Sequence, residues 1–84
     1  LNHMHIDDFL KLISHGFDVS FNYKDVFYTI SVINERNGER EYGIGSDNGF
    51  KADFESLDSI RSFVICDRTI EDIVDSLSNS DLFY

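Results

Sequence analysis

The stretch FDVSFNYKDVFYTISVI, residues 17–33, most constrains the fold of this chain. On both sides of Lys24-Asp25, apolar and aromatic side chains alternate with polar ones, which is the period of a strand with one buried face. A two-residue turn at Lys24-Asp25 predicts a hairpin in which every inward pair is apolar or aromatic. The expected pairs are Tyr23 with Val26, Phe21 with Tyr28, Val19 with Ile30, and Phe17 with Val32. A four-residue turn would keep the same inner face, and Lys-Asp lacks the Asn-Gly preference of tight turns, so the turn type stays open.

A third strand is predicted after this hairpin. Tyr42 and Ile44 reach the inner face only if the loop before them has an odd number of residues. Arg36-Asn37-Gly38 fits as a three-residue loop, a type I turn closed by a bulge glycine. A two-residue turn at Asn37-Gly38 would point the glycines beside Ile44 inward instead. The expected pairs are Val32 with Tyr42 and Ile30 with Ile44.

Helical periodicity predicts helices before and after these strands. An apolar stripe at i, i+3, i+4 and i+7 predicts a first helix over residues 5–15, which Gly16 ends. Phe54, Leu57 and Ile60 are typical of a short helix near 56–62. A last helix over 70–77 opens with the capping pair Thr69 and Asp72. FVIC (63–66) predicts a brief extended segment, and the tail after residue 77 either frays or docks.

Together these patterns predict the α+β class. The expected architecture is an N-terminal helix, a three-stranded antiparallel meander over residues 17–46 and two short C-terminal helices. A chain of 84 residues has room for one core, so residues 5–84 are expected to form a single domain. The opening letters LNHM, residues 1–4, resemble a cloning remnant and are set aside.

Charge and cysteine content limit the binding partners and the cellular location that can be expected. Sixteen acidic against seven basic residues give a formal net charge of -9, which repels nucleic acid and anionic membranes. The same charge favours a partner protein with a basic surface, or serves solubility alone. Cys66 is the single cysteine, so no intrachain disulfide can form and a reducing, cytoplasmic location is predicted. Beside Val64 and Ile65, it is expected to be a buried structural thiol. No apolar run approaches the roughly 20 residues of a membrane span, and no signal peptide is recognisable.

Motifs with chemical meaning are incomplete in this sequence. His3, His5 and His15 lack the spacing of zinc ligands. Asp47-Asn48-Gly49 lacks the alternating oxygen ligands of a calcium loop, and Gly43-Ile44-Gly45 lacks the third glycine of a phosphate-binding loop. We therefore expect no metal, no cofactor and no enzymatic activity.

Binding to a protein remains as the expected function. The outer face of the meander carries two large apolar residues, which form a contact patch or lie under the C-terminal tail. Carboxylates on the second hairpin and on the last helix can face a basic groove, although Arg36 and Arg40 partly cancel the hairpin acids. The candidate partner-binding residues are Phe27, Ile33, Glu35, Glu39, Glu41, Glu71, Asp72 and Asp75. The alternative is a self-associating structural protein that dimerises through Phe27, Ile33 and the tail Leu82-Phe83-Tyr84.

The pattern FDVSFNYKDVFYTISVI followed by FESLDSIRSFVICDRTIEDIVDSL resembles small acidic α+β proteins of Firmicutes and their phages or mobile elements. This resemblance covers nearly the whole chain but consists mostly of core positions, and it implies a fold and a genomic setting without an assigned activity. In architecture and charge the chain is also similar to small anti-CRISPR proteins, which occupy basic DNA-binding grooves. The first resemblance implies a prophage or mobile-element setting. Small size, acidity and the lack of a catalytic constellation lead us to expect an inhibitor, immunity or regulatory factor.

Overall fold

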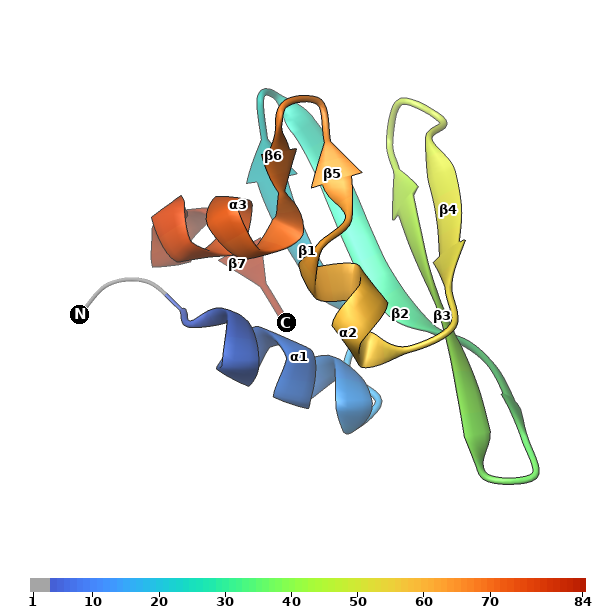
Figure 1. The fold of residues 1–84 in the computed structure, drawn as a ribbon. Coiled ribbons are helices and arrows are strands. Elements are labelled where there is room, and N and C mark those ends of the chain that lie inside the picture. Colours follow the sequence, from blue (N-terminus) through green and yellow to red (C-terminus); the bar gives the residue numbers. More distant parts are fainter. Residues whose placement is uncertain (1–3) are drawn as a thin grey trace.

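The structure is a computed structural model that describes residues 4–84, so residues 1–3 of the expected cloning remnant lie outside the described part. Met4 packs against the core. The chain runs from a first helix through a sheet to further short helices and a last short strand (Figure 1). The elements are α1 (Ile6–Ser14), β1 (Val19–Tyr23), β2 (Val26–Arg36), β3 (Glu39–Ser46), β4 (Lys51–Phe54), α2 (Leu57–Arg61), β5 (Val64–Ile65), β6 (Arg68–Thr69), α3 (Ile70–Ser76), η1 (Asn79–Asp81) and β7 (Leu82–Phe83).

The α+β class is confirmed, but the three-stranded meander is too small. The main sheet has five antiparallel strands in the order β4-β3-β2-β1-β7. Four residues of β4 are too few for alternation to be recognised, and Phe54 also fits the helical spacing of Leu57 and Ile60. The tail docks instead of fraying, since β7 pairs with β1 through Leu82 opposite Phe21.

The predicted register of the first hairpin is confirmed for three of its four pairs. Those three are Val19 with Ile30, Phe21 with Tyr28 and Tyr23 with Val26. Lys24 and Asp25 form a two-residue turn with φ values of 51° and 64°, both in the left-handed region that a type I′ turn requires. The fourth pair, Phe17 with Val32, is wrong because β1 begins two residues later. The Phe17 amide instead donates to the Leu12 carbonyl at 3.1 Å, beyond the end of α1.

In the second hairpin the inner face was predicted correctly and the loop wrongly. Val32 lies opposite Tyr42 and Ile30 opposite Ile44, as expected. The turn, however, has two residues, Asn37-Gly38, with φ values of 55° and 81°. The extra residue that the inner face requires is Ile33, which forms a β-bulge between Val32 and Asn34. A bulge inserts one unpaired residue into one strand, so it changes the parity just as an odd loop would.

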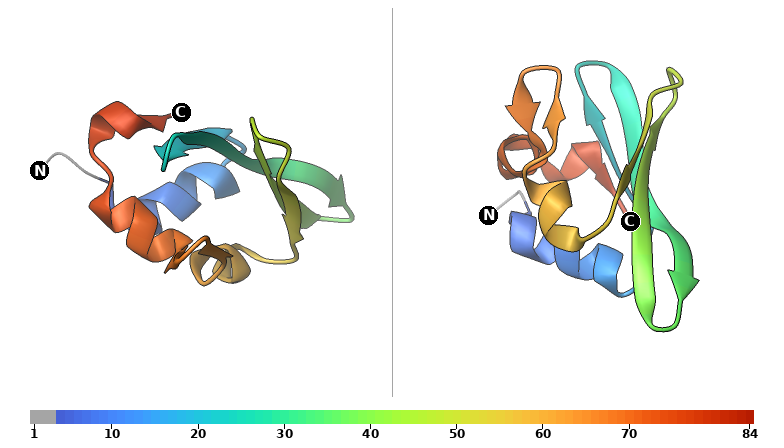
Figure 2. Two further views of the ribbon diagram at one scale, coloured as in Figure 1. Left: turned by 90° about the horizontal axis from the view of Figure 1, so that it is seen from above. Right: turned by 45° about the vertical axis from the view of Figure 1, so that its right-hand side comes forward.

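The three helices and the β5–β6 hairpin lie on the same side of the sheet (Figure 2). α1 buries the predicted stripe of Ile6, Phe9, Leu10 and Ile13 against it. The cap of α3 is confirmed, because Thr69 Oγ1 accepts a hydrogen bond of 3.1 Å from the Asp72 amide.

Cys66 is exposed, so the expectation of a buried thiol is wrong. It lies in the two-residue turn between β5 and β6, with a φ of 60°. The next residue, Asp67, joins this turn to the first hairpin. It accepts hydrogen bonds from the Tyr23 hydroxyl at 2.8 Å and from Lys24 Nζ at 3.2 Å. These two bonds hold the pKa of the Asp67 carboxyl below its usual value.

One core joins the sheet to the helices. Its largest fully buried side chains come from β1, β2 and all three helices: Phe9, Phe21, Ile13, Ile30, Ile60, Ile70, Ile73, Val19 and Val74. The Phe21 ring meets Phe9 edge-on at 6.0 Å and stacks on Tyr28 at 5.3 Å. Each such side chain contributes about 1.5–3 kcal/mol when it leaves water. Within residues 4–84, no helix is long and apolar enough to cross a membrane.

Candidate protein-binding surfaces

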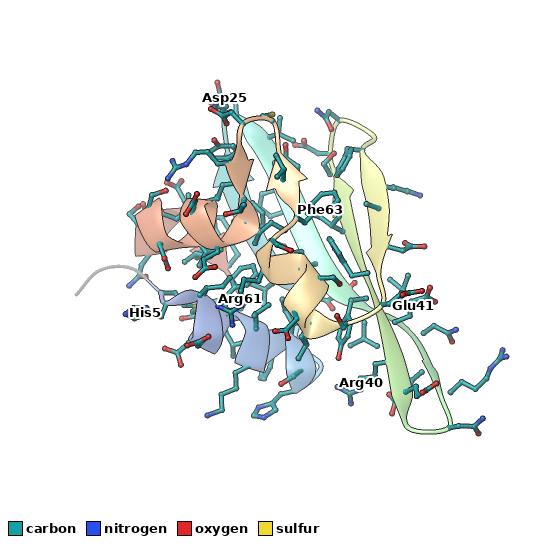
Figure 3. The ribbon with its side chains drawn as sticks, viewed as in Figure 1. His5, Asp25, Arg40, Glu41, Arg61 and Phe63 are labelled. Atoms are coloured by element: carbon teal, nitrogen blue, oxygen red, sulfur yellow. The ribbon has the colours of Figure 1, made fainter. Side chains whose placement is uncertain are left out.

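The N-terminal turns of α1 and α3 converge on one arginine of α2. Arg61 Nη2 donates to Asp7 Oδ1 at 2.8 Å, and Arg61 Nη1 lies 3.6 Å from Glu71 Oε2. Figure 3 shows Arg61 where the helices come together. We call the acidic residues of α1 and α3 the helical acid cluster, of which Asp7 and Glu71 contact Arg61. Its members are Asp7, Asp8, Glu71, Asp72 and Asp75.

The local sequence explains why these acids are tolerated on the helices. Four of the five lie in a first helical turn, where the helix dipole favours negative charge. The Arg61 hydrogen bond lowers the pKa of the Asp7 carboxyl, and the same bond raises the pKa of Arg61. Asp75 is the exception, because it lies near the C-terminal end of α3, whose last turn has no basic residue.

Three carboxylates of the helical acid cluster remain open to a partner. Within residues 4–84, Asp8, Asp72 and Asp75 make no ion pair with a lysine or arginine, and all three side chains are exposed. The structure therefore links Glu71 of the predicted set to Asp7 through Arg61, and the sequence singled out neither Asp7 nor Asp8 as a binding residue. Their acidity in the first helix was visible, but its proximity to α3 depends on tertiary packing.

The second predicted acidic set lies on the projecting β2–β3 hairpin and is largely balanced by arginines. Glu35 Oε1 is 3.4 Å from Arg40 Nε, and Glu39 lies opposite Arg36 in the register. Because side chains alternate along β3, Glu39 and Glu41 share one face while Arg40 takes the other.

Arg40 is also held in place from a second direction. Its guanidinium donates to the Ser14 carbonyl at the end of α1, and Figure 3 shows Arg40 and Glu41 where the hairpin leaves the body of the protein. A hollow of about 550 Å³ beside the hairpin is lined by charges of both signs: Arg36, Arg40, Glu39, Glu41 and Glu55, with Asn34 and Asn37. This mixture gives the hairpin a weaker field than its acids alone would have.

The predicted apolar residues of the outer face lie far apart. Phe27 packs against Phe83 of the docked tail, with ring centroids 5.6 Å apart, so the tail covers part of it. Ile33 lies six positions along β2, roughly 20 Å away at about 3.3 Å per residue. The outward positions between them are occupied by Thr29 and Ser31. Phe27 and Ile33 are thus two separate apolar spots.

The described residues 4–84 contain no group of three or more His, Cys, Asp or Glu side chains placed to hold a metal ion. Comparison of the chain with known protein families, curated proteins and solved structures gave no significant match. What the protein binds is therefore inferred from the charges and contacts of its own surface.

Proposed function

We propose that this protein is a small acidic protein-binding module, of the inhibitor, immunity or regulatory kind, which acts without catalysis. It docks through the helical acid cluster onto a basic surface of a partner protein. The observation that carries the proposal is the convergence of α1 and α3 at Arg61. The two helices carry five carboxylates, and within residues 4–84 three of these make no ion pair with an arginine or lysine.

The energetics of α3 support a role for these acids outside the fold. Asp75 is separated from Asp72 by three positions and from Glu71 by four, so it neighbours both on the helix surface. Like charges at these spacings destabilise a helix by roughly 0.2–0.5 kcal/mol per pair. Asp75 also opposes the helix dipole. A basic partner would turn these unfavourable contacts into favourable ones and speed the encounter.

The test compares two triple variants that remove equal charge from different surfaces. Asp8→Asn, Asp72→Asn and Asp75→Asn neutralise the open part of the helical acid cluster. Glu35→Gln, Glu39→Gln and Glu41→Gln change the net charge equally on the hairpin. Each tagged protein is used to capture partners from lysate of the source cell at low and high salt, with quantification by mass spectrometry.

We expect a protein with a basic surface that the wild type and the hairpin variant retain and the helical variant loses. High salt should weaken this capture, because exposed ion pairs are screened. Equal loss in both variants would show that only net charge matters, and loss in the hairpin variant alone would move the site to the hairpin. Either result, or no capture by the wild type, would overturn the proposal.

A further inference from the structure

β4 forms one end of the main sheet, and within residues 4–84 no strand lies beyond it (Figure 1). Its partner strand is β3, and the Ser46 amide donates to the Phe50 carbonyl at 2.9 Å just before β4 begins. In an antiparallel pair, residues alternate between bonding the neighbouring strand and pointing their backbone groups away from it. Because Phe50 bonds β3, alternation makes Ala52 the next residue whose backbone hydrogen-bonds to β3. The backbone N–H and C=O groups of Lys51 and Asp53 therefore point to the free edge of β4.

The side chains at this edge are complementary to themselves. Lys51 and Asp53 are exposed, and both lie on the uncovered face of the sheet, opposite Gly45 and Gly43. If a second copy pairs antiparallel with its Ala52 opposite Ala52, each Lys51 lies opposite Asp53 of the other copy, so the junction contains two Lys51–Asp53 pairs. Opposite charges in such cross-strand positions are stabilising, by roughly 0.2–1 kcal/mol per pair. A shift of two residues would place Lys51 opposite Lys51, or Asp53 opposite Asp53, so the charges also select the register.

A charged edge strand often prevents such pairing, and Lys is the usual residue for that purpose. To prevent edge-to-edge pairing of two identical strands in this way, the charges that meet across the edge must repel each other. Lys51 and Asp53 flank Ala52 with opposite signs, so a copy related by a twofold axis meets attraction at both positions.

Apolar side chains on the other side of β4 add a second, independent indication. Phe50 is 40% exposed and Val64 of the nearby β5 is 55% exposed. The Phe63 ring lies between Phe50 and Phe54, at centroid distances of 6.1 and 5.0 Å, and Figure 3 shows Phe63 between β5 and β4. In the register centred on Ala52, each Phe50 would lie opposite Phe54 of the second copy. The exposed Phe50 rings would then be removed from water.

We propose that the free edge of β4 pairs antiparallel with β4 of a second copy of this chain, which makes one continuous sheet across the dimer. The interface is short, so the dimer forms as protein concentration rises. The helical acid cluster lies on other elements and stays available to a partner. Self-association at β4 and docking at the helices are thus separate properties.

Charge reversal at the edge tests the proposal. Sedimentation and light scattering at increasing concentration would compare the wild type with Lys51→Asp, Asp53→Lys and the double exchange Lys51→Asp/Asp53→Lys. Both residues are exposed, so folding should survive, which circular dichroism and thermal unfolding of each variant would verify. We expect the mass of the wild type and of the double exchange to rise toward twice that of the chain. Both single variants should stay monomeric at the same concentrations.

The single variants also control for net charge. Lys51→Asp makes the charge of -9 more negative and Asp53→Lys makes it less negative, yet both should weaken the dimer. In the wild type, the Lys51 and Asp53 amides should exchange hydrogen more slowly as the dimer forms. A wild type that stays monomeric, single variants that dimerise like the wild type, or a double exchange that stays monomeric would each overturn the proposal. Replacing Ile33 with Ser should leave the mass unchanged, and loss of the dimer there would place the interface elsewhere.

Discussion

Ile33 of β2 lies over Gly43 of β3, so closely that a Cβ atom at position 43 would be 2.9 Å from Ile33 Cγ2. Ile33 is the extra residue of the bulge, and the bulge keeps Tyr42 and Ile44 on the buried face. Gly43 leaves room for the side chain that the bulge turns outward. The bulge at Ile33 thus depends on the glycine at position 43, although ten positions separate the two residues in the sequence.

This contact predicts that Gly43→Ala destabilises the protein by about 1 kcal/mol, within the usual range for an overpacked site. Ile33 is half exposed and can partly move aside, which limits the cost. In an Ile33→Ala background the same substitution should be neutral or slightly stabilising, because the space is then open and alanine restricts the unfolded chain more than glycine. Urea unfolding of the four proteins in this double-mutant cycle measures the coupling, and additive effects would contradict it.

Thr69→Ala should reduce the free energy of unfolding by about 1 kcal/mol, because it removes the acceptor of the Asp72 amide at the start of α3. Thr69→Ser keeps a hydroxyl oxygen at this position and serves as the matched control. Chemical denaturation would show the loss in the alanine variant and most of the wild-type stability in the serine variant. Equal losses in both would assign the effect to the missing methyl group.

The Asp7–Arg61 pair predicts a pH-dependent contribution to stability. Because the folded pKa of Asp7 is lowered, the pair stabilises the fold above the unfolded pKa of about 3.9 and loses this effect as pH falls through the folded value. Asp7→Asn should therefore unfold at a slightly lower temperature than the wild type at pH 7, and the difference should shrink as pH falls below about 3.9. The effect is small because the pair is exposed. Asp8→Asn, in the same helical turn but outside the ion pair, removes the same charge and is the control at pH 7.

The turn of the first hairpin predicts a stabilising substitution. Asp25 has a φ of 64°, which glycine adopts without the steric cost that an L-residue meets there. Asp25→Gly should raise the free energy of unfolding by up to about 1 kcal/mol, whereas Asp25→Ala should lower it. Lys24 stays in place in both variants, so its ion pair with Asp67 is kept. Thermal unfolding measures both variants, and a higher unfolding temperature for Asp25→Ala than for Asp25→Gly would contradict a strained turn.

The candidate surfaces show how far local sequence can predict a site. Glu71, Asp72 and Asp75 were predictable as one group because helical spacing places them together. Asp7 could not be assigned to them, because 64 positions separate it from Glu71 and only Arg61 connects the two. Phe27 and Ile33 shared a predicted face, yet alternation along a strand says nothing about the tail that covers Phe27.

Within the first hairpin from Val19 onward, α1 and α3, the sequence by itself determined which side chains face the core. Alternation and helical spacing depend on neighbouring residues alone, so the first hairpin, α1 and α3 could be predicted from their own sequences. Tertiary structure decided where the extra residue of the second hairpin lies, because a bulge at Ile33 and an odd loop produce the same inner face. Tertiary structure also decided which segments form the two edge strands of the sheet. The strands β4 and β7 have four and two residues, and segments this short are strands only because a neighbouring strand supplies their hydrogen bonds.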